Sequence, residues 1–276
     1  MKYRDGLGLQ SRIKTTYGKL LPAEKKIADY ILNQQSIPSI DIDSLAKETQ
    51  TSKASVSRFC RRLGYGGFKE FSLHLAQERI EKPKGTGNYI QKTVSGNAQA
   101  CLDTHYLIED EKIANLANRI AQAHRIFLFG SSAVMPVILD FFQKLLRVGI
   151  VCHYAEGRRI QNMESVLAHD NDLVISFDLS GETTSTVKAT QAAMDGGAYT
   201  VTICCGIGSS LSEVGHLHLY GVGQKTGNYI TGTGETRISL FTIVDIIFYK
   251  LIEALPKEQV EHALNRTKDV IIEEWK

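Results

Sequence analysis

The sequence predicts an all-α helix-turn-helix domain followed by a three-layer α/β domain with a parallel five-stranded sheet. Three observations lead to this prediction. Apolar residues recur at helical spacing in the first third of the chain, and five short β-branched or aromatic runs alternate with helical stretches in the rest. Positive charge is concentrated in the first third. A chain of 276 residues also commonly forms two domains.

Charge is divided unevenly along the chain. Residues 1–84 hold 16 Lys and Arg against 9 Asp and Glu, a net charge of +7. Residues 85–276 hold 16 against 21, a net charge of −5, so the chain total of +2 hides the split. Positive charge favours binding where it meets phosphate, because counterions are released there. The first third is therefore expected to bind nucleic acid, and the remainder is expected to have another task.

The boundary between the two domains is predicted from composition. The stretch EKPKGTGNY combines proline, glycine and charge between the helical region and the mixed region. We expect a helix-turn-helix domain over residues 1–82, a linker over 83–96 and a second domain over 97–276.

The first domain begins with amphipathic helices. Pro22 suits the first turn of a helix in which Ile27, Tyr30 and Ile31 share one face. Residues 36–39 include a proline and predict a loop. After the loop, residues 44–64 form the reader segment described next, and YGGFKEF then begins a helix that runs to about residue 80.

The stretch SLAKETQTSKASVSRFCRRLG, residues 44–64, predicts two short helices joined by a tight turn. In the first helix Leu45 and the small Ala46 face inward, so a second helix can cross nearby. The second begins near Thr51 or Ser52 and ends at Gly64. Its apolar stripe consists of Val56, Phe59, Cys60 and Leu63.

The opposite face of the second helix is polar and basic. Small side chains let a backbone approach base edges, and arginine pairs with guanine or phosphate, so this face suits the DNA major groove. A solvated helix of a small bundle is the alternative. The close crossing and the clustered charge favour a reader helix. The residues expected to contact double-stranded DNA are Ser52, Lys53, Ala54, Ser55, Ser57, Arg58 and Arg61.

The second domain is expected to alternate strands and helices. Each predicted strand is too short for a helix, which is typical of a parallel sheet covered on both faces. The strands are residues 126–129, 150–154, 173–177, 199–204 and 217–220. Helices over 98–106 and 111–123 precede the sheet, and helices over 235–255 and 256–275 follow it.

Hydroxyl-rich loops follow two of these strands. GSSAV comes after Phe129, and DLSGETTST comes after Phe177. Parallel sheets bind ligands at the carboxyl ends of strands, where helix starts offer N–H groups to anions. Plain helix capping explains either loop taken alone, but two loops on one sheet favour a small anionic or polyhydroxyl ligand. The expected ligand-binding residues are Ser131, Ser132, Asp178, Ser180, Gly181 and Thr183.

The sequence predicts neither a secreted protein nor one that spans a membrane. The N-terminal MKYRDGLGLQ has no apolar core of a signal peptide. The apolar run 238–255 contains Asp245 and Lys250, so it is expected to be a buried core helix or a dimer helix and not a membrane span. The five cysteines have no CxxC pair and no histidine at ligand spacing, which suits a reducing cytoplasm. Neither loop is a Walker or dinucleotide motif. We therefore expect a cytoplasmic protein without metal or cofactor.

The two halves together resemble the RpiR/MurR family of bacterial transcriptional regulators. The resemblance covers nearly the whole chain. It is carried first by LPAEKKIADYIL and SLAKETQTSKASVSRFCRRLGYGGFKEF, and then by IFLFGSS, FFQKLLRVGI, LSGET, AYTVTICC and ETRISLFTIVDIIFYKL. It implies a cytoplasmic repressor or activator, dimeric or tetrameric. It also implies a sugar-isomerase (SIS) domain that senses a phosphorylated sugar and alters DNA affinity.

The ligand loops depart from the family pattern. The first loop normally reads GxGxS, and here Val134 stands where a hydroxyl is expected. The second normally reads SxSGxTxE, and here Asp178 replaces the first serine. A carboxylate there repels a bound phosphate. We expect either an unphosphorylated or amino sugar that pairs with Asp178, which is slightly favoured, or a phosphosugar displaced toward Arg158 or Arg159.

Two other functions compete with an effector-controlled regulator. SIS folds also serve sugar isomerases, which need a base, and Glu182, Glu235 and His216 are the candidates. No sequence feature brings these three residues together in one site. A fold shared with enzymes is no evidence of catalysis without such a site, so an enzyme is the less favoured reading. The other alternative is a DNA-binding protein whose SIS domain only dimerises. In either regulator the apolar helix 238–255 offers a surface for a second copy, and the chain is expected to bind an inverted-repeat operator as an even-numbered homo-oligomer.

Overall fold

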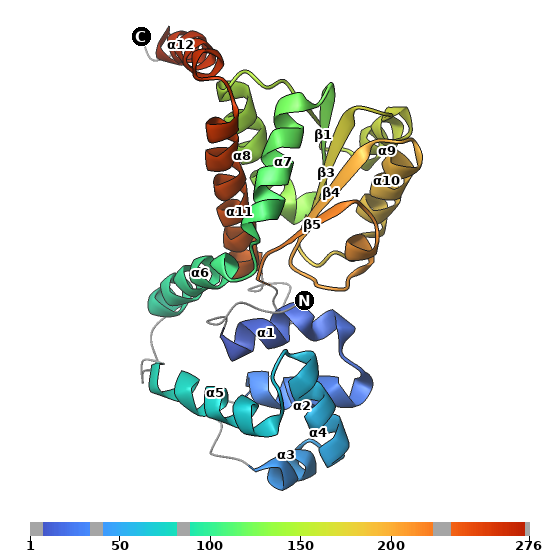
Figure 1. The fold of residues 1–276 in the computed structure, drawn as a ribbon, viewed down its shortest axis with the longest axis vertical. Helices are drawn as coiled ribbons and strands as arrows, with labels where there is room; N and C mark the ends of the chain where they lie inside the picture. Colours follow the sequence, from blue (N-terminus) through green and yellow to red (C-terminus); the bar gives the residue numbers. More distant parts are fainter. Residues whose placement is uncertain (1–7, 34–40, 82–88, 223–232, 274–276) are drawn as a thin grey trace.

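The computed structural model describes residues 8–33, 41–81, 89–222 and 233–273. It confirms the predicted fold class. A helical N-terminal domain lies below a three-layer α/β domain, as Figure 1 shows.

The N-terminal domain is a compact set of short helices around one apolar core. The core includes Ile27, Leu45, Val56 and Phe59, all completely buried. These residues recur at the helical spacing predicted from the sequence, which explains why the helices pack through those faces. The elements are α1 (Leu9–Thr16), η1 (Tyr17–Lys19), α2 (Pro22–Asn33), α3 (Ile42–Glu48), α4 (Lys53–Arg62) and α5 (Phe68–Glu81).

The second domain is built on a five-stranded sheet in which every pairing is parallel. The strand order is β2-β1-β3-β4-β5. The connection after β1 therefore leads to one side of the sheet, and the chain then returns past β1 to begin β3. The strands are β1 (Arg125–Phe129), β2 (His153–Tyr154), β3 (Asp172–Asp178), β4 (Tyr199–Cys204) and β5 (Leu217–Tyr220).

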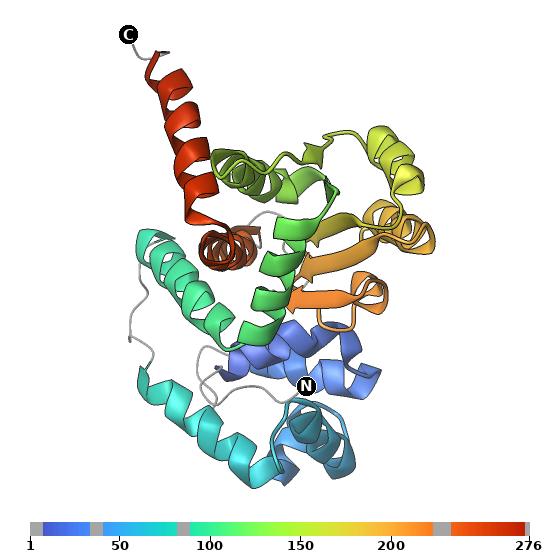
Figure 2. The same ribbon diagram turned by 45° about the horizontal axis from the view of Figure 1, so that its top comes forward.

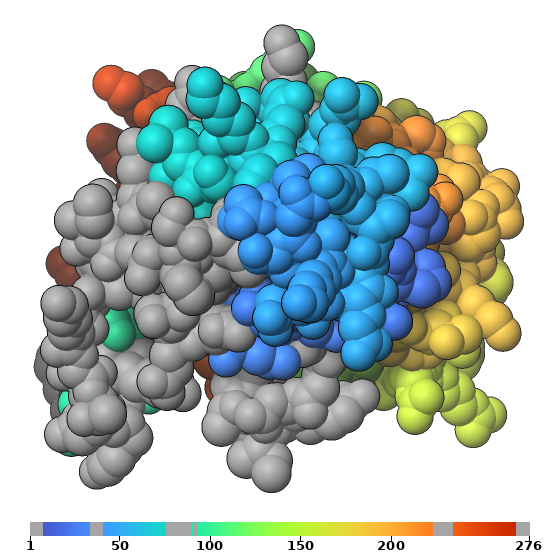
Figure 3. Space-filling model, turned by 90° about the horizontal axis from the view of Figure 1, so that it is seen from below, coloured from blue at the N-terminus to red at the C-terminus, as the bar shows by residue number. Residues whose placement is uncertain are grey.

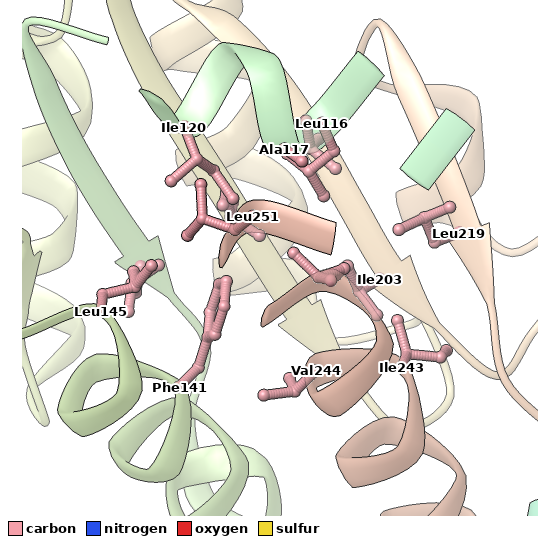
Figure 4. Close-up of a cluster of buried hydrophobic side chains, with 14 of the residues drawn as sticks. Leu116, Ala117, Ile120, Phe141, Leu145, Ile203, Leu219, Ile243, Val244 and Leu251 are labelled. Atoms are coloured by element: carbon pink, nitrogen blue, oxygen red, sulfur yellow. The ribbon is translucent and has the colours of Figure 1, made fainter. Parts of the chain in front are cut away.

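Helices cover both faces of this sheet (Figure 1). One face is covered by α7 (Asp110–Gln122), α8 (Met135–Arg147) and α11 (Thr233–Ala254). The other is covered by α9 (Arg158–Leu167) and α10 (Thr184–Asp195). Figure 4 shows the main core on the first face, where side chains of α7, α8 and α11 meet those of the strands.

Two elements differ from the sequence prediction, and a third matches it but lies at the outside of the domain. Helix α6 (Tyr89–His105) begins earlier than expected, so residues 89–96 of the expected linker are helical. Strand β2 is confined to His153–Tyr154, at the edge of the sheet beside β1. Helix α12 (Lys257–Glu273) agrees with the helix predicted over 256–275, and it projects from the body of the domain (Figure 1 and Figure 2).

Of the two roles expected for the apolar helix 238–255, a buried core helix or a dimer helix, its main apolar face takes the first. Leu240, Ile243, Ile247 and Leu251 of α11 are completely buried within the chain itself. They pack in the core with residues of α7 and α8 (Figure 4). The hydrophobicity of this helix therefore reflects its central place between layers.

The cysteines of the chain form no disulfide among the described residues. All five cysteines are free thiols. Burial raises the pKa of the Cys204 thiol to about 11, so this thiol stays protonated at neutral pH. In the part of the chain that the structure describes, no helix combines the length and apolar character needed to cross a bilayer.

Candidate DNA-reading helix and effector site

The helix-turn-helix is closed by a tight turn between α3 and α4. The Thr51 N–H donates to the Ala46 carbonyl over 2.8 Å. Gln50 has a φ of 51°, in the left-handed region that non-glycine residues rarely adopt. Ala46, only 6% exposed, allows the close crossing that the sequence predicts.

Both helices of this unit begin with a side-chain cap. Asp41 accepts the Ser44 N–H over 2.8 Å at the start of α3, and hydrogen bonds from the Ser44 backbone and side chain hold the pKa of Asp41 below its usual value. Ser52 accepts the Ser55 N–H over 3.1 Å at the start of α4. These caps fix where each helix starts.

Two of the cations on or beside α4 have partners. Arg62 Nε lies 2.9 Å from Oε2 of Glu24, a carboxylate whose side chain is only 2% exposed, so Arg62 holds α4 to α2. Lys53 forms an ion pair with Asp43 across the helix pair, with both side chains 63% exposed. Exposed pairs of this kind are weak, so Lys53 remains able to exchange Asp43 for a phosphate.

Arg58 and Arg61 have no carboxylate partner among the described residues and are exposed. Arg58 makes only a long contact of 3.4 Å to the Ser55 hydroxyl. The two guanidinium groups lie on the same outward face as Ala54, which is also exposed. Figure 3 views the molecule from below, and there the N-terminal domain lies nearest the viewer, in front of the α/β domain.

Most of the predicted DNA contacts lie on this face, with one exception. Ser52, Lys53 and Ala54 are exposed, and Ser57 is half-buried. Ser55 is only 7% exposed, and its hydroxyl lies 3.0 Å from that of Ser52 within the cap. Ser55 therefore stabilises the start of the helix, and its side chain is not available for a base.

The second candidate site lies where the strand order reverses, between the carboxyl ends of β1 and β3. The backbones of the two strand ends approach closely here, because a Cβ at Gly130 would lie 2.9 Å from the Phe177 carbonyl oxygen. Gln161 of α9, 3% exposed, fixes the end of β1 from the side. It accepts the Gly130 N–H over 3.2 Å and donates over 2.5 Å to the carbonyl oxygens of Gly130 and Ala155.

The first loop places Ser131 and Ser132 at this reversal point. Ser131 is half-buried and Ser132 is exposed. Ser132 has a φ of 54°. It stands where the GxGxS pattern has its second glycine, so the loop keeps a conformation that favours glycine.

The second loop, residues 178–183, is closed on itself. Oδ1 of Asp178 accepts the Ser180 hydroxyl over 3.0 Å and the Gly181 N–H over 2.5 Å. The Ser180 hydroxyl in turn accepts the Glu182 N–H over 3.1 Å. Asp178 is 4% exposed. The Asp178 carboxylate thus accepts the hydrogen bonds of the Ser180 hydroxyl and the Gly181 N–H, which an anionic ligand of this loop would otherwise accept.

Thr183 precedes the first turn of α10 without a side-chain capping bond. Behind it, the Thr186 hydroxyl is buried and has no hydrogen-bond partner within the described residues. One turn later, Thr190 donates to the Ser176 hydroxyl of β3 over 2.7 Å. The start of α10 therefore carries more unused hydrogen-bonding groups than residues 178–182.

A neighbouring segment, residues 205–211, clamps the second loop. Cys205 donates its N–H to the Leu179 carbonyl over 3.1 Å, and Leu211 donates to the Gly181 carbonyl over 2.8 Å. Glu182 accepts the Ser210 hydroxyl over 2.6 Å. We call residues 205–211 the clamp segment.

The clamp segment also contacts the N-terminal domain. Ile207 donates its N–H to the Thr15 carbonyl of α1 over 3.1 Å. A Cβ at Gly208 would lie 1.7 Å from Cε of Lys19, so the Lys19 side chain lies directly over that glycine. Lys14 pairs with Glu235 at 3.6 Å nearby. No motif in the sequence identified this contact, because it joins residues almost 200 positions apart.

Two of the three groups proposed for an isomerase, Glu182 and His216, lie at opposite edges of the sheet, and the third, Glu235 of α11, pairs with Lys14 of α1. His216 precedes β5, at the amino edge of the sheet, where its Nδ1 lies 2.9 Å from the Thr200 hydroxyl. Glu182 lies at the carboxyl edge, bonded to Ser210. An acid and a base at opposite edges do not act on one substrate.

A hollow of about 660 Å³ lies between α9 and α10. Both helices begin at the carboxyl edge of the sheet, after β2 and β3. The hollow is lined by Arg158, Arg159, Asn162, Met163, Val166, Thr184, Ser185 and Lys188. Arg158 and Arg159 were named from the sequence, whereas Lys188 was missed because it lies one turn inside a helix.

Comparison with known proteins agrees with both domains. The family model described as "Helix-turn-helix domain, rpiR family" matches residues 7–82, and that for the SIS domain matches residues 119–231. An uncharacterised HTH-type transcriptional regulator of Caldanaerobacter subterraneus is 27% identical over 94% of this chain and 95% of its own. The HTH-type transcriptional regulator HexR of Pseudomonas aeruginosa is 27% identical over 87% of each chain.

A solved structure is similar over almost the full length. It is the NanR protein of Vibrio vulnificus in complex with ManNAc-6P, with a TM-score of 0.63, 25% identity, and coverage of 96% of this chain and 98% of NanR. The relatives are named transcriptional regulators, and this chain shares their helix-turn-helix domain, which identifies it as a regulator. The chain belongs to the RpiR family of DNA-binding transcriptional regulators of sugar metabolism, with an rpiR-type helix-turn-helix domain followed by a SIS domain.

Proposed function

We propose that a sugar or sugar phosphate binds at the carboxyl edge of the SIS sheet and alters the affinity of α4 for its operator. The observation that carries this proposal is the double attachment of the clamp segment. It is hydrogen-bonded to the loop 178–183 on one side and to Thr15 of α1 on the other. NanR, a structural relative, was solved with a phosphorylated amino sugar, which supports this effector class.

The contacts continue from α1 to the reader helix. Arg12 of α1 is 5% exposed, and its Nη1 donates over 3.5 Å to the carbonyl of Leu63, the residue that caps the end of α4. The same guanidinium lies 4.9 Å from the centre of the Tyr65 ring. A ligand that moves residues 178–183 therefore shifts the clamp segment, then α1, and then the end of α4.

The experiment is an operator titration with matched variants. Wild type, Glu182→Ala and Glu213→Ala are titrated on operator DNA, with and without each member of a panel of hexoses and hexose 6-phosphates. Glu182→Ala removes the bond to Ser210, whereas Glu213→Ala removes the same charge from an exposed residue close to the clamp segment. We expect at least one panel member to change wild-type and Glu213→Ala affinity by about 5- to 150-fold, and Glu182→Ala to respond much less.

Two results would contradict the proposal. One is an operator affinity that no sugar or sugar phosphate changes, in which case the SIS domain serves assembly alone. The other is an undiminished effector response in Glu182→Ala, which would place the coupling outside the clamp segment.

We further propose that the chain acts as an even-numbered homo-oligomer on an inverted repeat, in the cytoplasm. One helix-turn-helix offers a small interface, and two-fold symmetry doubles it. The projecting α12, with Leu264 43% exposed, leaves surface for a second copy. Half-sites are expected about one helical turn apart or a multiple of it. A monomer in light scattering, or a footprint over a single half-site, would contradict this.

A further inference from the structure

We propose that the exposed side of α6 is the surface through which two copies of this chain associate. This surface, the α6 face, consists of Ile90, Val94, Ala98, Cys101 and Leu102 of α6 together with Tyr249 of α11. The inference rests on the proposed even-numbered homo-oligomer, because it assigns the place where one copy contacts the next. The partner is a second copy of the same chain.

The first observation is an exposed apolar stripe along α6. Ile90 is 54%, Val94 64% and Leu102 63% exposed, although side chains of this kind are usually buried. Positions 90, 94, 98 and 101 are three or four residues apart, so they share one side of the helix. The other side packs on α11, where the Thr104 hydroxyl donates to that of Ser239 over 3.0 Å. A contiguous exposed apolar stripe of this kind marks an interaction surface.

The apolar surface continues from α6 onto α11. The Thr242 hydroxyl of α11 donates to Sγ of Cys101 over 3.5 Å, so the two helices meet at this edge of the face. Tyr249 is 71% exposed and lies two turns after Thr242, on the same side of α11. Tyrosine is enriched at protein interfaces, because its ring is apolar and its hydroxyl forms hydrogen bonds. The α6 face therefore spans two neighbouring helices.

The second observation concerns charge. Within the described side chains of α6, at residues 90 and 93–105, no exposed residue is Asp, Glu, Lys or Arg, and Asp103 is buried. In a two-fold contact the residues near the axis meet their own copies, so a charged side chain there faces an identical charge. An uncharged face avoids this repulsion, and the cores of interfaces are depleted of charge. Charge complementarity therefore favours a second copy as the partner.

Two other exposed helices fit the centre of such a contact less well. The projecting α12 exposes charged residues along its length, among them Lys257, Glu261 and Arg266. Charge suits the rim of an interface more than its core, so we expect α12 at the rim. Helix α9 exposes Met163 and Val166, but it begins with two exposed arginines and covers the other face of the sheet (Figure 1). It is the rival surface in the test.

The size of the α6 face requires both helices. A helix of 17 residues is about 26 Å long and about 10–12 Å wide, so one side of it presents roughly 300 Å². A stable interface takes about 800 Å² from each partner. The α6 helix alone thus offers less than half of this area, and the adjoining outer side of α11 and the rim supply the rest.

The position of α6 also fits two-fold binding to DNA. This helix lies at the end of the α/β domain that is nearest to the N-terminal domain (Figure 1 and Figure 2). A two-fold axis beside α6 therefore brings two N-terminal domains close together. Half-sites about one helical turn apart require this arrangement.

The test measures the association of the full chain by light scattering and analytical ultracentrifugation over a range of protein concentrations. The key variant is Val94→Glu/Leu102→Glu, which places like charges on the α6 face at positions that are exposed in the single chain. Its control, Ile160→Glu/Val166→Glu, adds the same charge to α9 at positions that are 55% and 68% exposed. Thermal unfolding verifies that both variants keep the fold.

A second measurement needs no substitution. Cys101 is exposed in the single chain, whereas the other four cysteines are buried, so the rate of reaction with a maleimide reports on the α6 face. The rate is measured on associated wild type, on diluted wild type and on the key variant. A partner copy on the α6 face would shield Cys101 from the reagent.

We expect wild type and the α9 control to associate with the same Kd, and the key variant to associate at least about 100-fold more weakly. Cys101 should react at least about 10-fold faster in the key variant and in diluted wild type than in associated wild type, because the partner copy protects it.

The inference is overturned if the key variant associates as tightly as wild type, or if the α9 control dissociates to the same extent as the key variant. It is equally overturned if Cys101 reacts at the same rate in associated and diluted wild type. In these cases the homo-oligomer stands and uses another surface. A wild type that stays monomeric at every concentration, alone and on operator DNA, overturns both the inference and the proposed homo-oligomer. The operator titration with sugars still decides the effector response.

Discussion

The starts of α4 and α10 look alike in sequence, but their side chains are used in different ways. Both combine serine or threonine residues with a helix start, and both resemble a family motif. At α4, capping uses Ser52 and Ser55 and leaves Arg58 and Arg61 exposed. At α10, the loop uses Asp178 to satisfy its own donors. A matching motif therefore indicates a site only where its polar groups remain free for a ligand.

The comparison extends to the cations. Arg62 and Arg58 lie on the same helix, yet Arg62 holds a buried carboxylate and Arg58 makes one long contact to a hydroxyl. Position on the helix face decides between a structural and a recognition role. The predictions that follow test this division, starting with the largest expected effect.

Arg62→Ala should destabilise the N-terminal domain by about 2–3 kcal/mol, because the buried carboxylate of Glu24 loses its ionic partner. Lys53→Ala is the matched control: it breaks an exposed pair and should cost no more than about 1 kcal/mol. Urea denaturation followed by circular dichroism measures both. Adding Glu24→Gln to Arg62→Ala should restore part of the loss. Equal destabilisation by the two single variants would show that Arg62 has no special structural role.

Arg58→Ala should leave the fold intact and weaken operator binding by roughly 1–3 kcal/mol. The reason is that Arg58 is exposed on the outward face of α4 and lacks a carboxylate partner among the described residues. Fluorescence anisotropy on operator DNA at several salt concentrations measures the loss. Arg266→Ala on the distant α12 serves as control. Unchanged affinity together with an unchanged salt slope would mean that another surface reads the DNA.

Asp178→Ser should destabilise the α/β domain by about 1 kcal/mol, because the Gly181 N–H and the Ser180 hydroxyl lose their common acceptor. Asp178→Asn keeps an oxygen acceptor without the charge and should cost less. Hydrogen exchange at the Gly181 amide should accelerate in the serine variant only. If both variants exchange at the wild-type rate, the loop is held by contacts other than Asp178.

Much of the fold could be predicted because periodicity reports burial. The stripe of Val56, Phe59 and Leu63 and the five short strands are local patterns, and each appears in the structure. The start of α6 was missed because glycine and proline before it are typical of a linker. For the apolar helix 238–255 the sequence left both a core helix and a dimer helix open, because hydrophobicity alone does not distinguish a core layer from an interface.

The candidate sites were predicted only in part. The reader helix is a contiguous segment, so its outward face follows from helical geometry. Helical geometry does not tell which partner a hydroxyl binds. Ser55 was expected to contact DNA, and its hydroxyl lies in the helix cap instead. The clamp segment, Gln161 and Lys188 act through tertiary contacts with residues far along the chain, and no spacing in one sequence encodes them.

The central claim is that the effector loop and the DNA-binding domain share one segment. The most direct test is amide hydrogen exchange at Ile207, whose N–H donates to Thr15 of α1, in wild type, Glu182→Ala and Glu213→Ala. We expect Glu182→Ala alone to accelerate exchange at Ile207 and in the last turn of α1, because the clamp segment has lost its bond to the effector loop. Wild-type protection at Ile207 in Glu182→Ala would contradict the account.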